Sequence, residues 1–177
     1  SAAAGNSNIQ LFCGDALESG FPSQTFDVVT AIESSEHMPD KARFFAEAHR
    51  LLRPGGHCVV AAWLTPDRPY SMEAKYLLDP ICREGRLPSM ASAMEYRSML
   101  IAAGFHNIQV SHLTKQAKKT WSICASRIIR RFLGNSSFRR LLANRHFTNR
   151  VFAKTVFRIW LAYQIGSMRF GLFAARK

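Results

Sequence analysis

The chain has 177 residues, 47% of them apolar, and this composition excludes a disordered chain and a disulfide-stapled miniprotein. Its formal charge of +12 is divided unevenly: residues 1–112 contain 9 Lys and Arg and 12 Asp and Glu, whereas residues 113–177 contain 15 Lys and Arg and no acid. The length predicts one domain, and the charge asymmetry predicts an anionic partner for its second part.

The N-terminal segment predicts a helix end and two strands. Ser1–Ala4 followed by Gly5 is typical of the last helical turn before a glycine cap. Asn8–Cys13 predicts a short strand. Phe26–Ile32 is almost entirely apolar, which predicts a strand buried on both faces of a parallel sheet.

The next segment predicts a helix and a third strand. Asp40–Leu52 has the apolar spacing of an amphipathic helix, and Pro54-Gly55-Gly56 is expected to end it as a tight turn without chemistry. His57–Leu64 predicts another buried strand. The alternation of strands with a helix indicates a βαβ arrangement with right-handed crossovers.

The middle of the chain predicts two helices and a strand. Ser71–Cys82 favours a short helix. Ser92 and Glu95 have the S-x-x-E spacing of a capping box at the start of a second helix, and Gly104 ends it. Asn107–Leu113 predicts a further strand.

The basic region predicts three helices and a closing strand, Met168–Ala175. The second helix is short and lies near Phe138, and the third covers Phe147–Ile165. The first helix, which Gly134-Asn135 ends, has an apolar stripe at helical spacing. The stripe consists of Trp121, Cys124, Ala125, Ile128, Ile129, Phe132 and Leu133.

The four cysteines form no CxxC pair, so a zinc site is not expected. Cys13 and Cys58 lie in apolar runs and are interpreted as buried, reduced thiols, which favours a cytosolic compartment. The apolar stretch between Arg158 and Arg169 is too short to span a bilayer.

Residues 10–64 resemble the second half of a class I S-adenosylmethionine-dependent methyltransferase. The resemblance rests on Gly14-Asp15-Ala16, Phe26-Asp27-Val28-Val29 and Leu51-Leu52-Arg53-Pro54-Gly55-Gly56. The run Glu33-Ser34-Ser35-Glu36-His37-Met38-Pro39-Asp40 is similar to the γ-tocopherol methyltransferase-like group. The similarity continues to the C-terminal Phe170-Gly171-Leu172-Phe173.

The resemblance implies an α/β, Rossmann-like class I methyltransferase sheet with S-adenosylmethionine as cofactor and no metal. The family's glycine-rich loop and ribose-binding acid do not precede Ser1, so we expect an N-terminally truncated sheet that lacks its first two strands. Such a fragment is expected to be inactive alone, and the activity is assigned to the intact parent.

The expected partial domain, residues 1–177, has three parts. Residues 1–64 form the cofactor-side core, and residues 65–104 form an insertion and a helix. Residues 105–177 contain the last two strands, with a basic helical insertion at 114–167 between them. We call residues 114–167 the cap.

Four residues at the ends of strands are expected to bind the cofactor. Asp15 would accept a hydrogen bond from the adenine amino group, and the backbone of Ala16 would meet a ring nitrogen; a turn-forming Gly-Asp is the alternative. Ile32 and Glu33 end the next strand, where the methionine part of the cofactor would pass. A carboxylate after a buried run is expected to need a partner.

Four further residues are candidates for binding or converting the acceptor. His37 is the candidate general base because its pKa lies near working pH, and a structural hydrogen bond is its alternative. Glu36 is a candidate acceptor contact, although we expect it to face solvent. Trp63 either walls the acceptor pocket or packs in the core. For Trp121 packing is expected, and contact with the acceptor is the alternative.

Topology predicts that both insertions, residues 65–91 and the cap, follow parallel strands and emerge on the cofactor side. A basic helical cap over the active-site mouth would exclude water and select a bulky apolar molecule. The predicted function is methyl transfer to a small lipophilic or aromatic acceptor, in the cytoplasm, with peripheral membrane contact through the cap.

A nucleic-acid-binding protein or RNA methyltransferase is the alternative function, because uncompensated positive charge attracts phosphates. No RNA-binding motif accompanies that charge, so nucleic acid is ranked below the lipophilic acceptor. A third interpretation is a solvated cationic surface. The acceptor, and whether O, N or C receives the methyl group, are not determined by the sequence.

Overall fold

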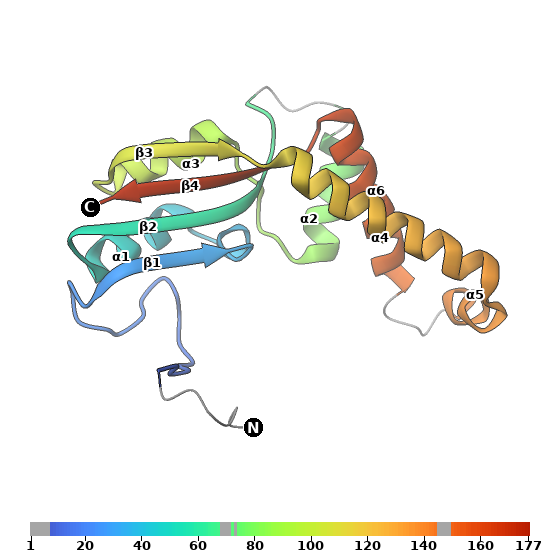
Figure 1. Ribbon diagram of the computed structural model, residues 1–177, viewed down its shortest axis with the longest axis horizontal. Helices are drawn as coiled ribbons and strands as arrows, with labels where there is room; N and C mark the ends of the chain where they lie inside the picture. The colour runs from blue at the N-terminus through green and yellow to red at the C-terminus, as the bar shows by residue number, and fades with distance from the viewer. Residues whose placement is uncertain (1–7, 68–71, 73, 145–149) are drawn as a thin grey trace.

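A computed structural model describes residues 8–67, 72, 74–144 and 150–177 (Figure 1). Its centre is a four-stranded sheet in the order β1-β2-β4-β3. Strand β1 pairs in parallel with β2, and β4 is antiparallel to both β2 and β3. Strands β1, β2 and β3 therefore run in one direction. The strands are β1 (Phe26–Ile32), β2 (Leu52–Leu64), β3 (His106–His112) and β4 (Arg169–Arg176).

Helices α1 (Lys41–Leu51) and α3 (Ala93–Ala102) cover one face of the sheet (Figure 1), and we call the strands with these two helices the sheet layer. Asp40 caps α1 by accepting the N–H of Arg43, and the predicted capping box at the start of α3 is confirmed. The core of the layer is an aromatic cluster. The ring of Tyr96 stacks on Phe173 at 5.1 Å and meets Phe45 edge-on.

The second face of β1 is open. Val29 and Ala31 point toward the helices, whereas Val28 is 53% exposed and Ile32 72% exposed. The prediction of a strand buried on both faces is therefore wrong. Among the described residues, helices pack on one face of β1 only, and its apolar composition does not reveal this.

The strand predicted at Asn8–Cys13 is also wrong. Residues 9–13 are an exposed irregular segment, and Cys13 is exposed rather than buried. An apolar run forms a strand only beside a partner, and the described sheet pairs its four strands without this segment. The helix end predicted at Ser1–Ala4 lies outside the described residues.

Pro54-Gly55-Gly56 is strand rather than turn. Helix α1 ends at Leu51 and β2 begins at Leu52, five residues earlier than predicted. The backbone N–H of Gly55 donates to the carbonyl of Lys177, and the carbonyl of Gly56 accepts the N–H of Lys177, so the segment is held by the C-terminus. Gly55 has a φ of +80°, which a glycine adopts without strain.

The first insertion contains one turn of π-helix, η2 (Ala74–Leu78), and helix α2 (Asp79–Gly85). These elements account for the described part of the helix predicted at Ser71–Cys82. Residues 68–71 and 73 are not described.

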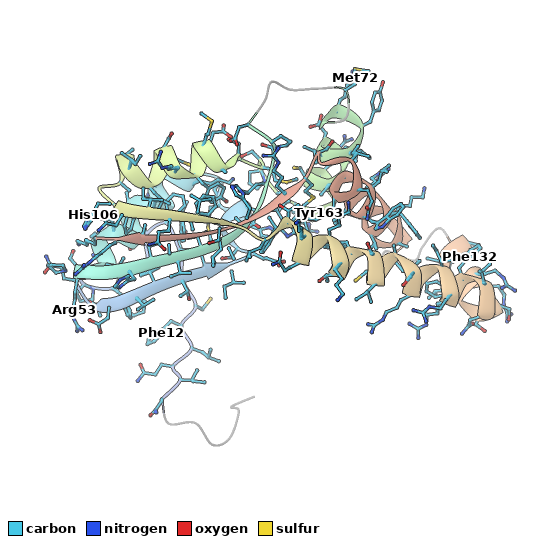
Figure 2. All side chains as sticks on the ribbon, turned by 45° about the horizontal axis from the view of Figure 1, so that its top comes forward. Phe12, Arg53, Met72, His106, Phe132 and Tyr163 are labelled. Atoms are coloured by element: carbon cyan, nitrogen blue, oxygen red, sulfur yellow. The ribbon has the colours of Figure 1, made fainter. Side chains whose placement is uncertain are left out.

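The cap consists of α4 (Thr114–Gly134), α5 (Ser136–Ala143) and α6 (Arg150–Ile165), which lie between β3 and β4 as predicted. Asn135 ends α4, and its side chain caps α5 by accepting the N–H of Phe138. Helices α4 and α5 extend away from the sheet, and α6 packs between α4 and α2 (Figures 1 and 2). This packing forms a second core around Ile81, Ile159, Tyr163 and Met168.

Candidate functional site

The candidate site lies where β1 and β2 end and the cap begins. Glu33 directly follows β1 with a φ of 47°, a left-handed conformation that is unfavourable for a residue other than glycine. Its N–H donates to the carbonyl of Ala61 at 2.8 Å, which holds it there. Such strained residues cluster at functional sites, so the outlier itself supports a functional role. The Glu33 side chain is exposed rather than buried as the sequence predicts.

Glu36 lies in η1 (Ser35–His37), the single 3-10 turn that follows β1. The expectation that it faces solvent is wrong, because Glu36 is only 2% exposed. Its Oε1 accepts the backbone N–H of Trp63 at 2.7 Å, which joins the turn to the end of β2. Burial raises the pKa of Glu36, and the N–H of Trp63 opposes this shift.

Lys41 holds the same turn from the first residue of α1. Its buried Nζ donates to the carbonyl of Met38 at 3.2 Å and to the hydroxyl of Ser89 at 3.3 Å. Burial lowers the pKa of Lys41. Nothing in the sequence distinguishes this lysine from a solvent-facing one, because one of its partners, Ser89, comes from a segment almost fifty residues away.

Four of the candidate residues line one cavity of about 210 Å³: Glu33, Glu36, His37 and Trp63. The His37 side chain is exposed at this cavity. Two carboxylates and an imidazole thus share one small space at the carboxyl edge of the parallel strands.

A neighbouring cavity of about 310 Å³ shares Glu33 and Trp63 and is also lined by Trp121 and Tyr163. The indole rings of Trp63 and Trp121 meet edge-on with centroids 5.8 Å apart. The structure therefore brings Trp121 to the candidate site, where it both packs and forms a wall.

Tyr163 is the residue of this site that the sequence does not single out. It is 2% exposed, and among the described residues its hydroxyl has no hydrogen-bond partner. Burial raises the pKa of Tyr163, and the nearby carboxylates of Glu33 and Glu36 raise it further. Its only sequence signal is an apolar position in the helix predicted at Phe147–Ile165. A buried hydroxyl without a partner costs free energy unless a ligand satisfies it.

The remaining cofactor candidates lie outside these cavities. Asp15 Oδ1 accepts the N–H of Leu17 at 2.8 Å, which is the turn-forming alternative, although the exposed carboxylate stays accessible. Ala16 is exposed beside it. Ile32 is exposed next to Glu33 at the end of β1.

The site is suited to binding a partly apolar molecule and removing a proton from it. The aromatic walls supply apolar contact, and His37 and the carboxylates supply proton acceptors. Within the described part of the chain, no three His, Cys, Asp or Glu side chains form a metal-binding group. The described helices include none long and apolar enough to cross a membrane.

Comparison with known proteins agrees with the fold. Residues 1–60 match the family described as "Methyltransferase domain". The chain is 32% identical over 112 residues to tocopherol O-methyltransferase, chloroplastic, of Arabidopsis thaliana, which covers 60% of this chain and 32% of that protein. It is 36% identical over 100 residues to 2-methyl-6-phytyl-1,4-hydroquinone methyltransferase of Synechocystis, covering 55% and 31% respectively.

The chain spans about a third of the length of these curated relatives. Among solved structures, phosphoethanolamine N-methyltransferase 2 of Haemonchus contortus in complex with S-adenosyl-L-methionine superposes with a TM-score of 0.72 at 19% identity. The superposition covers 92% of this chain and 36% of that structure, and at this identity it supports the fold alone.

Proposed function

This chain is related to the tocopherol methyltransferases and other S-adenosylmethionine-dependent methyltransferases, and from that premise we propose that the protein transfers a methyl group to a small lipophilic or aromatic acceptor. The observation that carries the proposal is the convergence of Glu33, His37, Trp63 and Tyr163 at the carboxyl edge of the parallel strands. Open α/β sheets bind their ligands at this edge.

The side chains of the site have the chemistry needed to bind the cofactor. Glu33, which is exposed and in a strained conformation, lines both cavities, where a polar ligand can contact it. Asp15 and Ala16 would hold the adenine, and Ile32 and Glu33 would hold the methionine part. S-adenosylmethionine supplies an already activated methyl group, so the protein contributes mainly alignment and proton transfer.

The acceptor would lie against Trp63 and Trp121, whose edge-on rings form an apolar wall. His37 takes the proton from the acceptor as its nucleophilic atom is methylated. Glu36 positions Trp63 through the backbone hydrogen bond and does not touch the acceptor. Tyr163 donates its hydroxyl hydrogen to a polar atom of the acceptor.

Methyl transfer is tested with tritium-labelled S-adenosylmethionine, using 2-methyl-6-phytyl-1,4-hydroquinone as the first acceptor. The 177-residue chain and the full-length gene product are assayed side by side. Labelled product supports the proposal, and its absence with both proteins across prenylated phenols contradicts the acceptor class. Cofactor binding is measured separately by equilibrium dialysis.

His37→Ala is expected to lower turnover at least about tenfold without loss of cofactor binding, because proton transfer contributes at least this much. His106→Ala, at the opposite end of the sheet, is the matched control. Turnover near that of the wild type would remove His37 from the mechanism.

Tyr163→Phe separates a binding role from a structural one. If the hydroxyl serves the acceptor, KM rises roughly tenfold, as expected for one hydrogen bond, while the free energy of unfolding does not fall. Tyr96→Phe is the contrast, because the Tyr96 hydroxyl already bonds to the Ser35 hydroxyl at 2.9 Å. An unchanged KM in Tyr163→Phe rules out the acceptor contact.

The proposal also locates the protein in the cytoplasm, with the cap at a membrane surface. A nucleic-acid partner remains the second candidate, because residues 113–177 carry 15 cations and no acid. An RNA gel shift compared with vesicle binding separates the two.

A further inference from the structure

The outer end of the cap leaves its apolar side chains uncovered. None of the eight residues of α5 is buried, and α4 buries only Ala125 among its 21 residues. A helix as short as α5 is marginal by itself and normally needs an apolar face packed against another surface. Phe132 and Leu141 are exposed, and Leu133 is 70% exposed.

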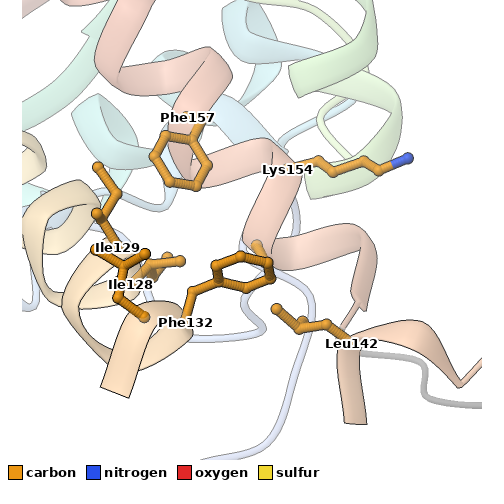
Figure 3. A pocket seen from close by; sticks show the side chains of 8 residues that line it. Ile128, Ile129, Phe132, Leu142, Lys154 and Phe157 are labelled. Carbon is orange, nitrogen blue, oxygen red and sulfur yellow. The ribbon is translucent and has the colours of Figure 1, made fainter. Parts of the chain in front are cut away.

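Phe132 and Leu133 line an open groove of about 600 Å³ between α4, α5 and α6. Figure 3 shows Phe132, Leu142 and Phe157 facing one another across it, with Lys154 extending its ammonium group away from them. We call this the tip groove. Exposed apolar side chains that gather around one groove indicate a docking surface.

The tip groove is held in a fixed shape. Arg139 on α5 donates from Nη1 to the carbonyls of Phe132 and Leu133 at 3.0 and 2.9 Å, which satisfies the C-terminus of α4. Arg131 lies over the ring of Phe138 at 5.8 Å. These contacts join α4 to α5. The apolar residues are therefore already in position before a partner binds.

The charge on the exposed face of α4, beside the groove, indicates which partner binds there. Lys119, Ile123 and Arg130 follow at i, i+4 and i+11, so cations and an apolar side chain share one exposed face of α4. Arg127 and Arg140 are exposed nearby. Among the residues whose side chains the structure describes, Arg158 of α6 forms an ion pair with Glu84 of α2.

We propose that the exposed face of α4 beside the tip groove docks on an anionic phospholipid surface, with Ile123, Ile129 and Leu133 entering the headgroup region and Lys119, Arg127 and Arg130 contacting lipid phosphates. Apolar side chains flanked by cations are the arrangement that binds such interfaces. The inference rests on the membrane contact in the proposed function and names its residues and lipid charge. It does not depend on methyl transfer.

The consequence is a direct route for a lipophilic acceptor. Trp121, which forms the wall with Trp63 of β2, lies on the same helix as the tip, because α4 contains both Trp121 and Leu133. A molecule dissolved in the bilayer is thus brought to within one helix length of the candidate site.

The test is cosedimentation of the full chain with vesicles of phosphatidylcholine, alone or mixed with phosphatidylglycerol, without cofactor or acceptor. Binding to the mixed vesicles that weakens with salt is expected, with little binding to phosphatidylcholine alone. Absence of binding to the mixed vesicles, or equal binding to both, overturns the proposal. Because no methyl transfer is measured, a failure here is distinct from a failure of the enzyme assay.

Two variants of the tip and two matched controls on α3 localise the binding. Arg127→Gln with Arg130→Gln should weaken binding roughly fivefold for each cation removed, and Leu133→Ser should weaken it roughly tenfold. Leu133 is too exposed for its loss to unfold the core, and circular dichroism verifies this. Arg97→Gln and Ile101→Ser change an exposed cation and an exposed apolar residue elsewhere.

If the tip and control variants weaken vesicle binding equally, the proposed location of the membrane contact is overturned. Other occupants give other outcomes, each of which overturns the proposal. A second copy of the chain would produce a concentration-dependent dimer without vesicles that Leu133→Ser dissociates. RNA would bind with equal or greater salt sensitivity and compete with the vesicles completely.

Discussion

The sheet layer and the cap are built from the same kinds of side chain. They differ in how completely their buried polar groups are hydrogen-bonded. In the sheet layer, the buried Tyr96 hydroxyl bonds to Ser35, and Glu47 is paired with Arg50. In the cap core, the buried hydroxyls of Tyr163 and Ser167 have no partner among the described residues. The sheet layer therefore favours stability, whereas the cap retains groups that a ligand or surface can satisfy.

Deleting a core side chain from each region tests this difference most strongly. Phe45→Ala removes a fully buried ring from the sheet layer and should lower the free energy of unfolding by about 4 kcal/mol. Alkylation of Cys58 reports the change, because burial raises its pKa to about 12 and keeps it unreactive while the sheet is folded. The exposed Cys13 is the internal control. Unchanged Cys58 protection would contradict the expected role of Phe45.

Ile81→Ala removes a fully buried side chain of α2 from the second core, which α2 forms with the cap. It should lower the free energy of unfolding by about 3 kcal/mol. Here the loss of stability should be confined to the cap and the α2 helix packed against it. Tryptophan fluorescence, which reports Trp63, Trp121 and Trp160, should change at lower urea than Cys58 becomes reactive. If both probes shift together, the two regions unfold as one unit and the comparison fails.

Glu47→Gln tests the electrostatics of the sheet layer at a smaller scale. The Arg50 guanidinium, helped by hydrogen bonds from Ser19, lowers the pKa of Glu47 from 4.5 to about 2. The folded state is therefore stabilised above pH 4.5, and this contribution is lost as the pH falls from 4.5 toward 2. The variant should lose roughly 2 kcal/mol at neutral pH and show a shallower decline in acid, measured by urea unfolding at several pH values.

Glu18→Gln is the control for that experiment, since Glu18 forms an exposed ion pair with Arg43. Such pairs contribute little to stability. If the free energy of unfolding of Glu47→Gln declines in acid as steeply as that of the wild type, the pair of Glu47 and Arg50 does not stabilise the fold.

Ser92→Ala should have the smallest effect, about 1 kcal/mol, because it removes the side-chain half of the capping box. Ser98→Ala, an exposed position in the same helix, is the control, and thermal unfolding measures both. If the two variants are equally stable, packing rather than the cap holds the start of α3.

Local rules predicted much of the fold. The capping box at Ser92, the 3.6-residue spacing in α4 and the apolar run of β1 depend on neighbours a few residues apart. The convergence of Glu33, Glu36, His37 and Trp63 followed from the rule that parallel strands end at one edge.

What the sequence by itself determined are most of the helices and strands, their order and the edge of the sheet where the candidate site lies. Only the tertiary structure decided which side chains are covered there, because burial depends on groups far apart in the chain. Glu36 is buried because the N–H of Trp63, 27 residues later, requires an acceptor. Tyr163 lines the site because α6 returns across the end of β2, and β1 is open on one face because the described helices pack on the other.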